Sequence, residues 1–169
     1  MTENILPLII SIAAFLIAII TFFLVKSQKQ PPPPAQDGFS SKPLQLQAYE
    51  RIAMLAERIA IPNLVSRVNQ QADLSAREMH LLLLESIKQE YEYNASQQIY
   101  VTPVAWQAII NLKDQNMLII NQVSATLPDE ARGIDLNRRL MEFMMTQPKG
   151  QLHTIVLEAL NFEAKKLMK

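Results

Sequence analysis

The side chains that most often hold metals or act as nucleophiles are scarce in this sequence. Cysteine is absent, and the histidines are His80 and His153. A di-iron bundle needs Glu-x-x-His on two helices, but Glu78 stands only two residues before His80 and the pattern is not repeated. Zinc sites need three or four ligands. We therefore expect no metal and no cofactor, and we interpret His80 as a surface or core-edge histidine.

Other patterns that could support acid–base or nucleophilic chemistry have simpler explanations. A serine nucleophile needs a histidine base and a strained turn with glycine, and no serine here has that setting. Glu85, Glu90 and Glu92 could supply paired carboxylates, but a solvated helix face explains their spacing better. We predict no catalytic residue, and we favour a protein without enzymatic activity.

Several basic residues could contact lipid phosphate. Arg138 and Arg139 are adjacent, and Lys42, Arg51 and Arg58 are further candidates. Ordinary surface charge is the simpler interpretation for the arginine pair.

Two features could form a partner-binding surface. Met141, Met144 and Met145 cluster on one short segment, and such soft side chains adapt to partners, although they also fill cores. Lys113 and Asn116 are polar residues within an apolar pattern. They could face each other across a buried network, open onto a groove, or fix the register of the packing.

Composition excludes some functions. Lys+Arg and Asp+Glu each number 16, so the net charge is zero, which is unlike the basic excess of a nucleic-acid binder. The three glycines are far apart, which excludes a glycine-rich phosphate loop.

The N-terminus predicts a membrane anchor. Residues 5–25 carry no charge, and such a helix would be roughly 31 Å long, close to the thickness of a hydrocarbon core. Ser11 and Thr21 could bond back to the helix's own carbonyls. A cleaved signal peptide is disfavoured because there is no positive n-region, the apolar run is long, and no small-x-small site follows.

The flanking charges predict the orientation of this anchor. Lys26 and Lys29 follow the span, and Glu3 is the charged residue before it. By the positive-inside rule the N-terminus is outside and the rest of the chain is cytoplasmic. Residues 26–43 form a proline-rich linker, since four consecutive prolines at 31–34 favour the stiff polyproline II conformation. A ligand for a polyproline-binding groove is the less favoured alternative.

Residues 44–169 predict a helical globular domain. Apolar residues recur at intervals of three and four residues, which is typical of helices. The first of these helices is predicted to end at Pro62. Ser75 and Glu78 form a capping box for the next helix, and Leu81 to Leu84 should be buried on all sides. Thr102 and Pro103 start a helix reaching about Leu127, whose two apolar seams predict a central position.

The expected fold class is all-α. It comprises a transmembrane helix (within domain 1–25), a linker (26–43) and an irregular bundle of five or six helices (44–169).

Four segments carry a resemblance to a known family: QLQAYER at 45–51, IPNLVSR at 61–67, SIKQEYEYN at 86–94 and AWQ at 105–107. With them, the chain resembles a family of uncharacterised proteins from Bacteroidetes-type bacteria. That resemblance implies a single-pass protein of the bacterial inner membrane with a helical domain of unknown function. It implies no activity, cofactor or site residue.

These patterns favour a membrane-tethered interaction module, an adaptor or accessory subunit. Residues 5–25 would contact the bilayer, and the helical domain would bind a membrane or cytoplasmic protein, but no nucleic acid. The alternatives are a membrane-bound enzyme with an unrecognised site and a homo-oligomeric structural protein.

Overall fold

The computed structural model of the chain describes residues 14–15, 17–22, 41–68, 73–146 and 152–169. The chain consists of two compact units, Met1–Ser40 and Ser41–Lys169. The described residues of the first unit are helical and exposed. Thr21 donates a hydrogen bond to the carbonyl oxygen of Ile17 at 2.9 Å, which satisfies its hydroxyl within the helix as the sequence predicts.

Among the residues that the structure describes, no helix has both the length and the apolar content needed to cross a bilayer. The predicted anchor (residues 5–25) and linker (residues 26–43) lie mostly outside the described residues. Residues 14–15 and 17–22 of the anchor and residues 41–43 of the linker are described.

The second unit is helical, so the predicted all-α fold is confirmed for the described residues. Its described part contains six α-helices and one 3-10 helix. These are α2 (Lys42–Ile59), α3 (Ile61–Val68), α4 (Ala76–Asn94), η1 (Ala95–Ile99), α5 (Pro103–Ser124), α6 (Gly133–Thr146) and α7 (Leu152–Leu167).

Two predicted helix starts are confirmed in detail. The Ser75 hydroxyl oxygen accepts a hydrogen bond from the Glu78 amide at 3.3 Å, and the Glu78 carboxylate accepts one from the Ser75 amide at 2.9 Å. The Thr102 hydroxyl oxygen accepts a hydrogen bond from the Ala105 amide at 3.1 Å. Such bonds satisfy amide groups that the first turn of a helix leaves without a partner.

Helix ends differ from the predictions. Pro62 does not end α2, which already ends at Ile59; it lies in the first turn of α3, where the missing amide hydrogen costs no helical bond. Helix α5 ends at Ser124 instead of near Leu127.

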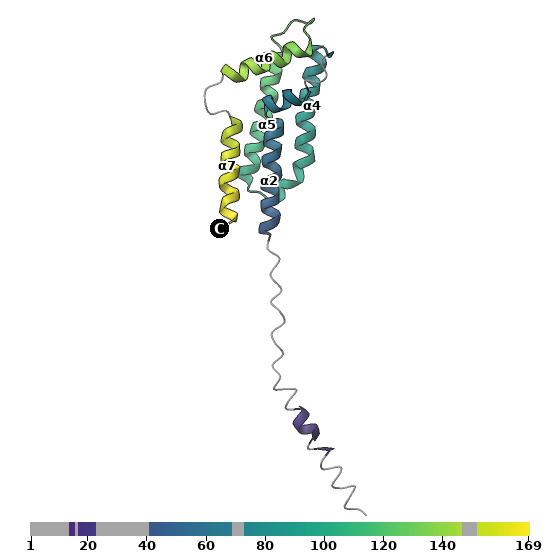
Figure 1. Cartoon of the computed structure of the whole chain (residues 1–169), viewed down its shortest axis with the longest axis vertical. Helices are drawn as coiled ribbons and strands as arrows, with labels where there is room; N and C mark the ends of the chain where they lie inside the picture. Colours follow the sequence, from purple (N-terminus) through teal and green to yellow (C-terminus); the bar gives the residue numbers. More distant parts are fainter. Residues whose placement is uncertain (1–13, 16, 23–40, 69–72, 147–151) are drawn as a thin grey trace, which may run out of the picture. The chain divides into compact units, whose positions relative to one another are not determined.

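The predicted central position of α5 is confirmed. This helix contacts α2, α4, α6 and α7. In Figure 1, α2, α4, α5 and α7 run alongside one another, and α6 lies across one end of them. One of the two predicted apolar seams of α5 includes Ile109, Leu112 and Val123, and these three side chains are buried.

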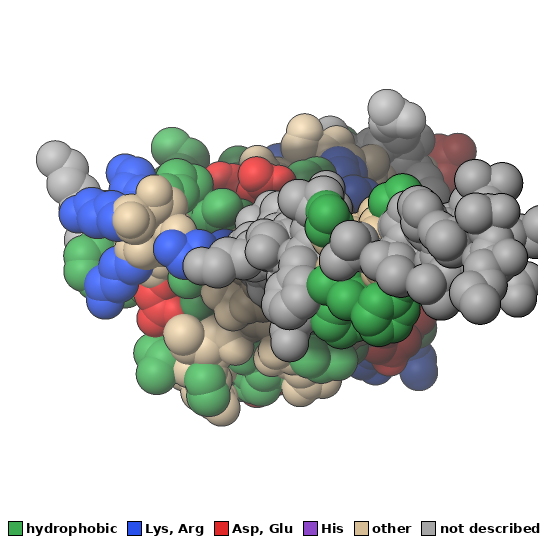
Figure 2. Space-filling model, turned by 90° about the horizontal axis from the view of Figure 1, so that it is seen from below, with side chains coloured by type: hydrophobic (Ala, Val, Ile, Leu, Met, Phe, Trp, Pro, Cys, Tyr) green, Lys and Arg blue, Asp and Glu red, His purple; other side chains and the backbone are tan. Residues whose placement is uncertain are grey.

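Helices α2 and α7 are antiparallel neighbours. The Tyr49 hydroxyl oxygen lies 2.5 Å from Glu163 Oε2, and Glu57 Oε2 lies 3.3 Å from His153 Nε2. Residue numbers increase along α2 in the direction in which they decrease along α7, so the two helices run antiparallel. The start of α2 and the end of α7 lie at the same end of the unit (Figure 1), and Figure 2 looks onto that end.

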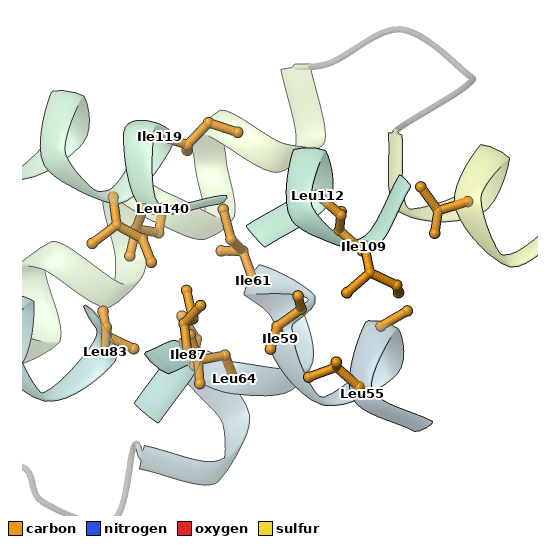
Figure 3. Packing of buried hydrophobic residues seen from close by; sticks show 14 of the residues in the cluster. Leu55, Ile59, Ile61, Leu64, Leu83, Ile87, Ile109, Leu112, Ile119 and Leu140 are labelled. Carbon is orange, nitrogen blue, oxygen red and sulfur yellow. The ribbon is translucent and has the colours of Figure 1, made fainter. Parts of the chain in front are cut away.

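Aliphatic side chains from several helices meet in one core. Figure 3 shows Ile59 of α2, Ile87 of α4 and Ile109 of α5 among them, and all three are fully buried. The prediction that the leucine run is buried on all sides was wrong: Leu83 is fully buried, but Leu81 is 58% exposed. Successive residues point about 100° apart around a helix, and the side of α4 that carries Leu81 is left largely exposed by the described helices.

The second unit contains a hydrophobic core of its own. Every buried hydrophobic side chain among the described residues lies between residues 48 and 160. The described apolar burial that drives folding therefore lies within the second unit, and we expect residues 41–169 to fold alone.

Close backbone contact joins the starts of α4 and α6. The Gly133 amide donates a hydrogen bond to the Leu74 carbonyl at 2.7 Å, and the Ala76 amide donates one to the Ala131 carbonyl at 2.8 Å. A Cβ atom on Gly133 would lie 3.0 Å from the Leu74 carbonyl oxygen and 3.1 Å from Met79 Cβ. Glycine is therefore the residue that permits this approach.

Candidate functional site

The two polar residues predicted on α5 face different neighbours. Asn116 is buried, and its side-chain amide donates a hydrogen bond to the Ile59 carbonyl at 2.8 Å. It thus satisfies a carbonyl of the last turn of α2. Lys113 is half-buried, with its Nζ 2.8 Å from Asp114 and 4.8 Å from the centre of the Tyr91 ring. The two residues therefore do not form one binding site with each other.

The three predicted methionines on α6 fall into two groups. Met141 and Met144 are partly buried and pack against the core, as residues that fill space between helices do. Met145 is 82% exposed. Of the three, Met145 is therefore the side chain fully available to another molecule.

A groove of about 540 Å³ lies between α5 and α6. Val123 and Phe143 supply its apolar part, and both also belong to the core packing. The polar residues that line it are Gln122, Thr126, Arg139, Glu142 and Thr146. Arg139 and Glu142 are 3.3 Å apart in an exposed ion pair. An apolar floor with a polar rim is the usual form of a binding surface for another protein.

The two histidines make separate contacts. The His80 Nε2 atom lies 2.7 Å from Asn121 Oδ1, which links α4 to α5. His153 contacts Glu57 but forms no hydrogen bond through its Nε2 atom. No group of three or more metal-ligating side chains occurs among the described residues. His80 is partly buried at the edge of the core, and both histidines have structural roles in joining helices.

Glu90 has a structural contact that the sequence did not indicate. Its carboxylate lies 2.7 Å from Arg58 Nε and 3.3 Å from Arg67 Nη1, and its side chain is only 16% exposed. The prediction of a solvated glutamate was wrong for this residue. The three side chains connect α2, α3 and α4 and border a groove of about 560 Å³ that also includes Tyr93.

A polar cluster that sequence reasoning missed joins α2, α5 and α7. Glu163 Oε2 accepts hydrogen bonds from the Tyr49 and Thr102 hydroxyls, both at 2.5 Å. The Thr102 amide donates to the Tyr49 oxygen at 3.2 Å. Burial, followed by the neighbouring Glu163, raises the pKa of Tyr49 above its ordinary value of 10.0. The phenol therefore stays protonated and acts as a donor.

The remaining predicted basic residues take part in surface contacts. Arg138 lies 3.7 Å from Asp135, an exposed pair within α6. The Arg51 guanidinium lies 5.4 Å from the centre of the Tyr93 ring. Pairs this exposed contribute little to stability.

The comparison with protein-family models identifies a family for this chain. The model of a family described as a family of unknown function, DUF7935, matches residues 1–167. No curated protein and no solved structure matches the chain.

Proposed function

The chain belongs to DUF7935, a family of unknown function, and from this premise we propose that it is a single-pass membrane protein whose helical unit binds a protein partner. The observation that carries the proposal for partner binding is the groove between α5 and α6. Helix α6, which forms one wall of that groove, also carries the exposed Met145. A groove with an apolar floor and a polar rim, on a helix that also exposes a large apolar side chain, is typical of an interaction surface.

The length and composition of residues 5–25 support the membrane anchor. Twenty-one uncharged residues suffice to cross a hydrocarbon core of about 30 Å as a helix. Lys26 and Lys29 support a cytoplasmic location for the helical unit, with the N-terminus outside. The resemblance to proteins of Bacteroidetes-type bacteria supports the bacterial inner membrane as the location.

Carbonate extraction of native membranes tests the anchor. We expect the full chain to stay with the lipid pellet, because an inserted apolar helix is not released at high pH. Deletion of residues 1–26 should move the chain to the supernatant. Release of the intact chain by carbonate would contradict the proposed anchor.

Site-specific photo-crosslinking tests the partner surface. A photoreactive amino acid at Met145 should give a discrete crosslinked product in native membranes, since that side chain is exposed on α6, the helix that borders the groove. The matched control is Met54 on α2, which is also a methionine and is 60% exposed, and it should give none.

The mass of the crosslinked product distinguishes between partner types. A product equal to twice the chain mass of 19.2 kDa would identify a homo-oligomer and replace the adaptor proposal. A product with a different protein would support that proposal. Equal, diffuse labelling from Met145 and Met54 would overturn the assignment of the surface.

A further inference from the structure

The end of the helical unit that carries the start of α2 is built from two segments. These are residues 41–48 at the start of α2 and residues 164–169 at the end of α7, here called the tip. The antiparallel contacts of Tyr49 with Glu163 and of Glu57 with His153 place both segments at the same end. Figure 1 shows α2 and α7 reaching this end together.

The side chains of the tip carry positive charge only. Lys42, Lys165, Lys166 and Lys169 are all exposed, and neither segment contains Asp or Glu. The nearest acidic residue along α7, Glu163, accepts hydrogen bonds from two hydroxyls. In Figure 2, Lys and Arg side chains gather at the left margin, on the side of α7. In a chain of zero net charge, this is a local excess of four positive charges.

Exposed apolar side chains accompany these lysines. Met168 is 68% exposed and Phe162 is 62% exposed. The Lys166 ammonium lies 4.3 Å from the centre of the Phe162 ring, so the two side chains occupy the same surface. Lysines whose stems lie beside aromatic and aliphatic groups are characteristic of helices that contact the lipid headgroup region.

A neighbouring loop adds apolar surface near the tip. Ile99 is 74% exposed and Val104 is 73% exposed. Thr102 lies between them in sequence and bonds to Tyr49 and Glu163. The contact fixes this loop against α2 and α7 at the base of the tip.

We propose that the tip docks on the anionic headgroup surface of a lipid bilayer. The lysines supply attraction to phosphate groups. Met168 in the tip and Phe162, which lies just before it on α7, supply apolar contact at the interface. The inference rests on the proposed anchor, which keeps the tip near the bilayer: 15 residues separate Val25 from Ser41, so the linker can extend at most roughly 55 Å from the end of the anchor. Tethering of this kind raises the effective concentration of a weak binding surface.

Lysine labelling in nanodiscs tests this proposal with the full chain. One set of discs contains only zwitterionic phosphatidylcholine, and the other also contains anionic phosphatidylglycerol. We expect an amine-reactive reagent to modify the four tip lysines at least roughly threefold more slowly in the anionic discs, and high salt should remove the difference because it screens the attraction. Lys88, which is exposed on α4, is the internal control and should react equally in both.

Charge-neutral variants supply a second measurement. Residues 41–169 contain a hydrophobic core of their own, so this fragment can be tested for co-sedimentation with anionic vesicles. K165Q/K166Q/K169Q should weaken vesicle binding about tenfold or more. The matched control, R77Q/K88Q/R132Q, removes three exposed charges on α4 and just before α6 and should bind as the unchanged fragment does.

The outcomes separate this inference from the proposed function. A chain that fails to insert into either disc contradicts the anchor. An inserted chain whose tip lysines react equally in both discs overturns the docking and leaves the anchor in place; the lysines would then be available to an acidic protein. Equal loss of vesicle binding in both triple variants would also overturn it, because general charge would then explain the binding.

Discussion

The two ends of the helical unit are held together by different kinds of interaction. At the end covered by α6, backbone groups bond directly across the starts of α4 and α6, from Gly133 to Leu74 and from Ala76 to Ala131. At the tip, side chains form the connection, through Tyr49, Thr102 and Glu163. Direct backbone contact demands close packing and tolerates little change, whereas contact through side chains leaves the surrounding surface free to carry charge.

The largest expected effect is in the core beneath the α6-covered end. Leu83→Ala should lower the free energy of unfolding by about 2–5 kcal/mol, because it removes a fully buried side chain and leaves a cavity. Leu81→Ala, two residues away on the exposed side of α4, should change it by no more than about 0.5 kcal/mol. Urea unfolding of residues 41–169 measures both, and equal losses would contradict the packing described for α4.

The next effect tests the close backbone approach itself. Gly133→Ala should lower the free energy of unfolding by about 1–3 kcal/mol, since the added methyl group meets a backbone oxygen at 3.0 Å and Met79 at 3.1 Å. Gly133→Ser should cost at least as much. Unchanged unfolding midpoints in both variants would show that α4 and α6 can move apart without loss of stability. The proposed difference between the α6-covered end and the tip would then be wrong.

A smaller effect is expected at the base of the tip. Tyr49→Phe should lower the free energy of unfolding by about 0.5–1.5 kcal/mol, because it removes hydrogen bonds to Glu163 and Thr102. Tyr93→Phe, on a ring that is 74% exposed, should have no measurable effect. Urea unfolding at neutral pH compares the two.

The same hydroxyl predicts a dependence on alkaline pH. The pKa of Tyr49 is raised above 10.0 in the folded chain. The associated stability is therefore fully present below pH 10.0 and is lost as the pH rises through the raised folded value. Tyr49→Phe should remove this part of the alkaline loss, and an identical pH profile in the variant would contradict it.

The smallest effect concerns the charge at the tip. Lys165→Gln should change the free energy of unfolding by no more than about 0.5 kcal/mol, because this exposed side chain interacts only weakly with the end of α7. Thermal unfolding measures the change. A loss of stability as large as that of Gly133→Ala would mean that Lys165 stabilises the fold. Docking on lipid would then not be needed to explain why a lysine occupies this position.

Local signals in the sequence predicted local structure well. The bonds of Ser75 with Glu78 and of Thr102 with Ala105 join residues three positions apart, so the residue types and spacing contain all the information needed. The central position of α5 was also predictable, since apolar residues on two sides require two sets of neighbours. The side of α4 that carries Leu81 was not, because it depends on which helices pack against it.

The polar contacts across the unit could not be predicted from spacing. Glu163 and Tyr49 are 114 positions apart, and Glu90 meets arginines from two other helices. Each glutamate has the same local pattern as a solvated residue, and only the tertiary arrangement distinguishes them. The predicted partner-binding residues illustrate the same limit: Met145 is exposed, while Asn116 bonds to the Ile59 carbonyl inside the core.

The antiparallel pairing of α2 with α7 has a mechanical consequence. Suppose that the residues before Ser41 are anchored in lipid and that a partner is bound at α6. A tensile force between the two would then act on the first turn of α2, parallel to the axis of that helix. Helices loaded in this way slide past each other, so the contacts between Tyr49 and Glu163 and between Glu57 and His153 resist together. The unit is thereby arranged to bear tension in shear, and it would not be peeled open one contact at a time.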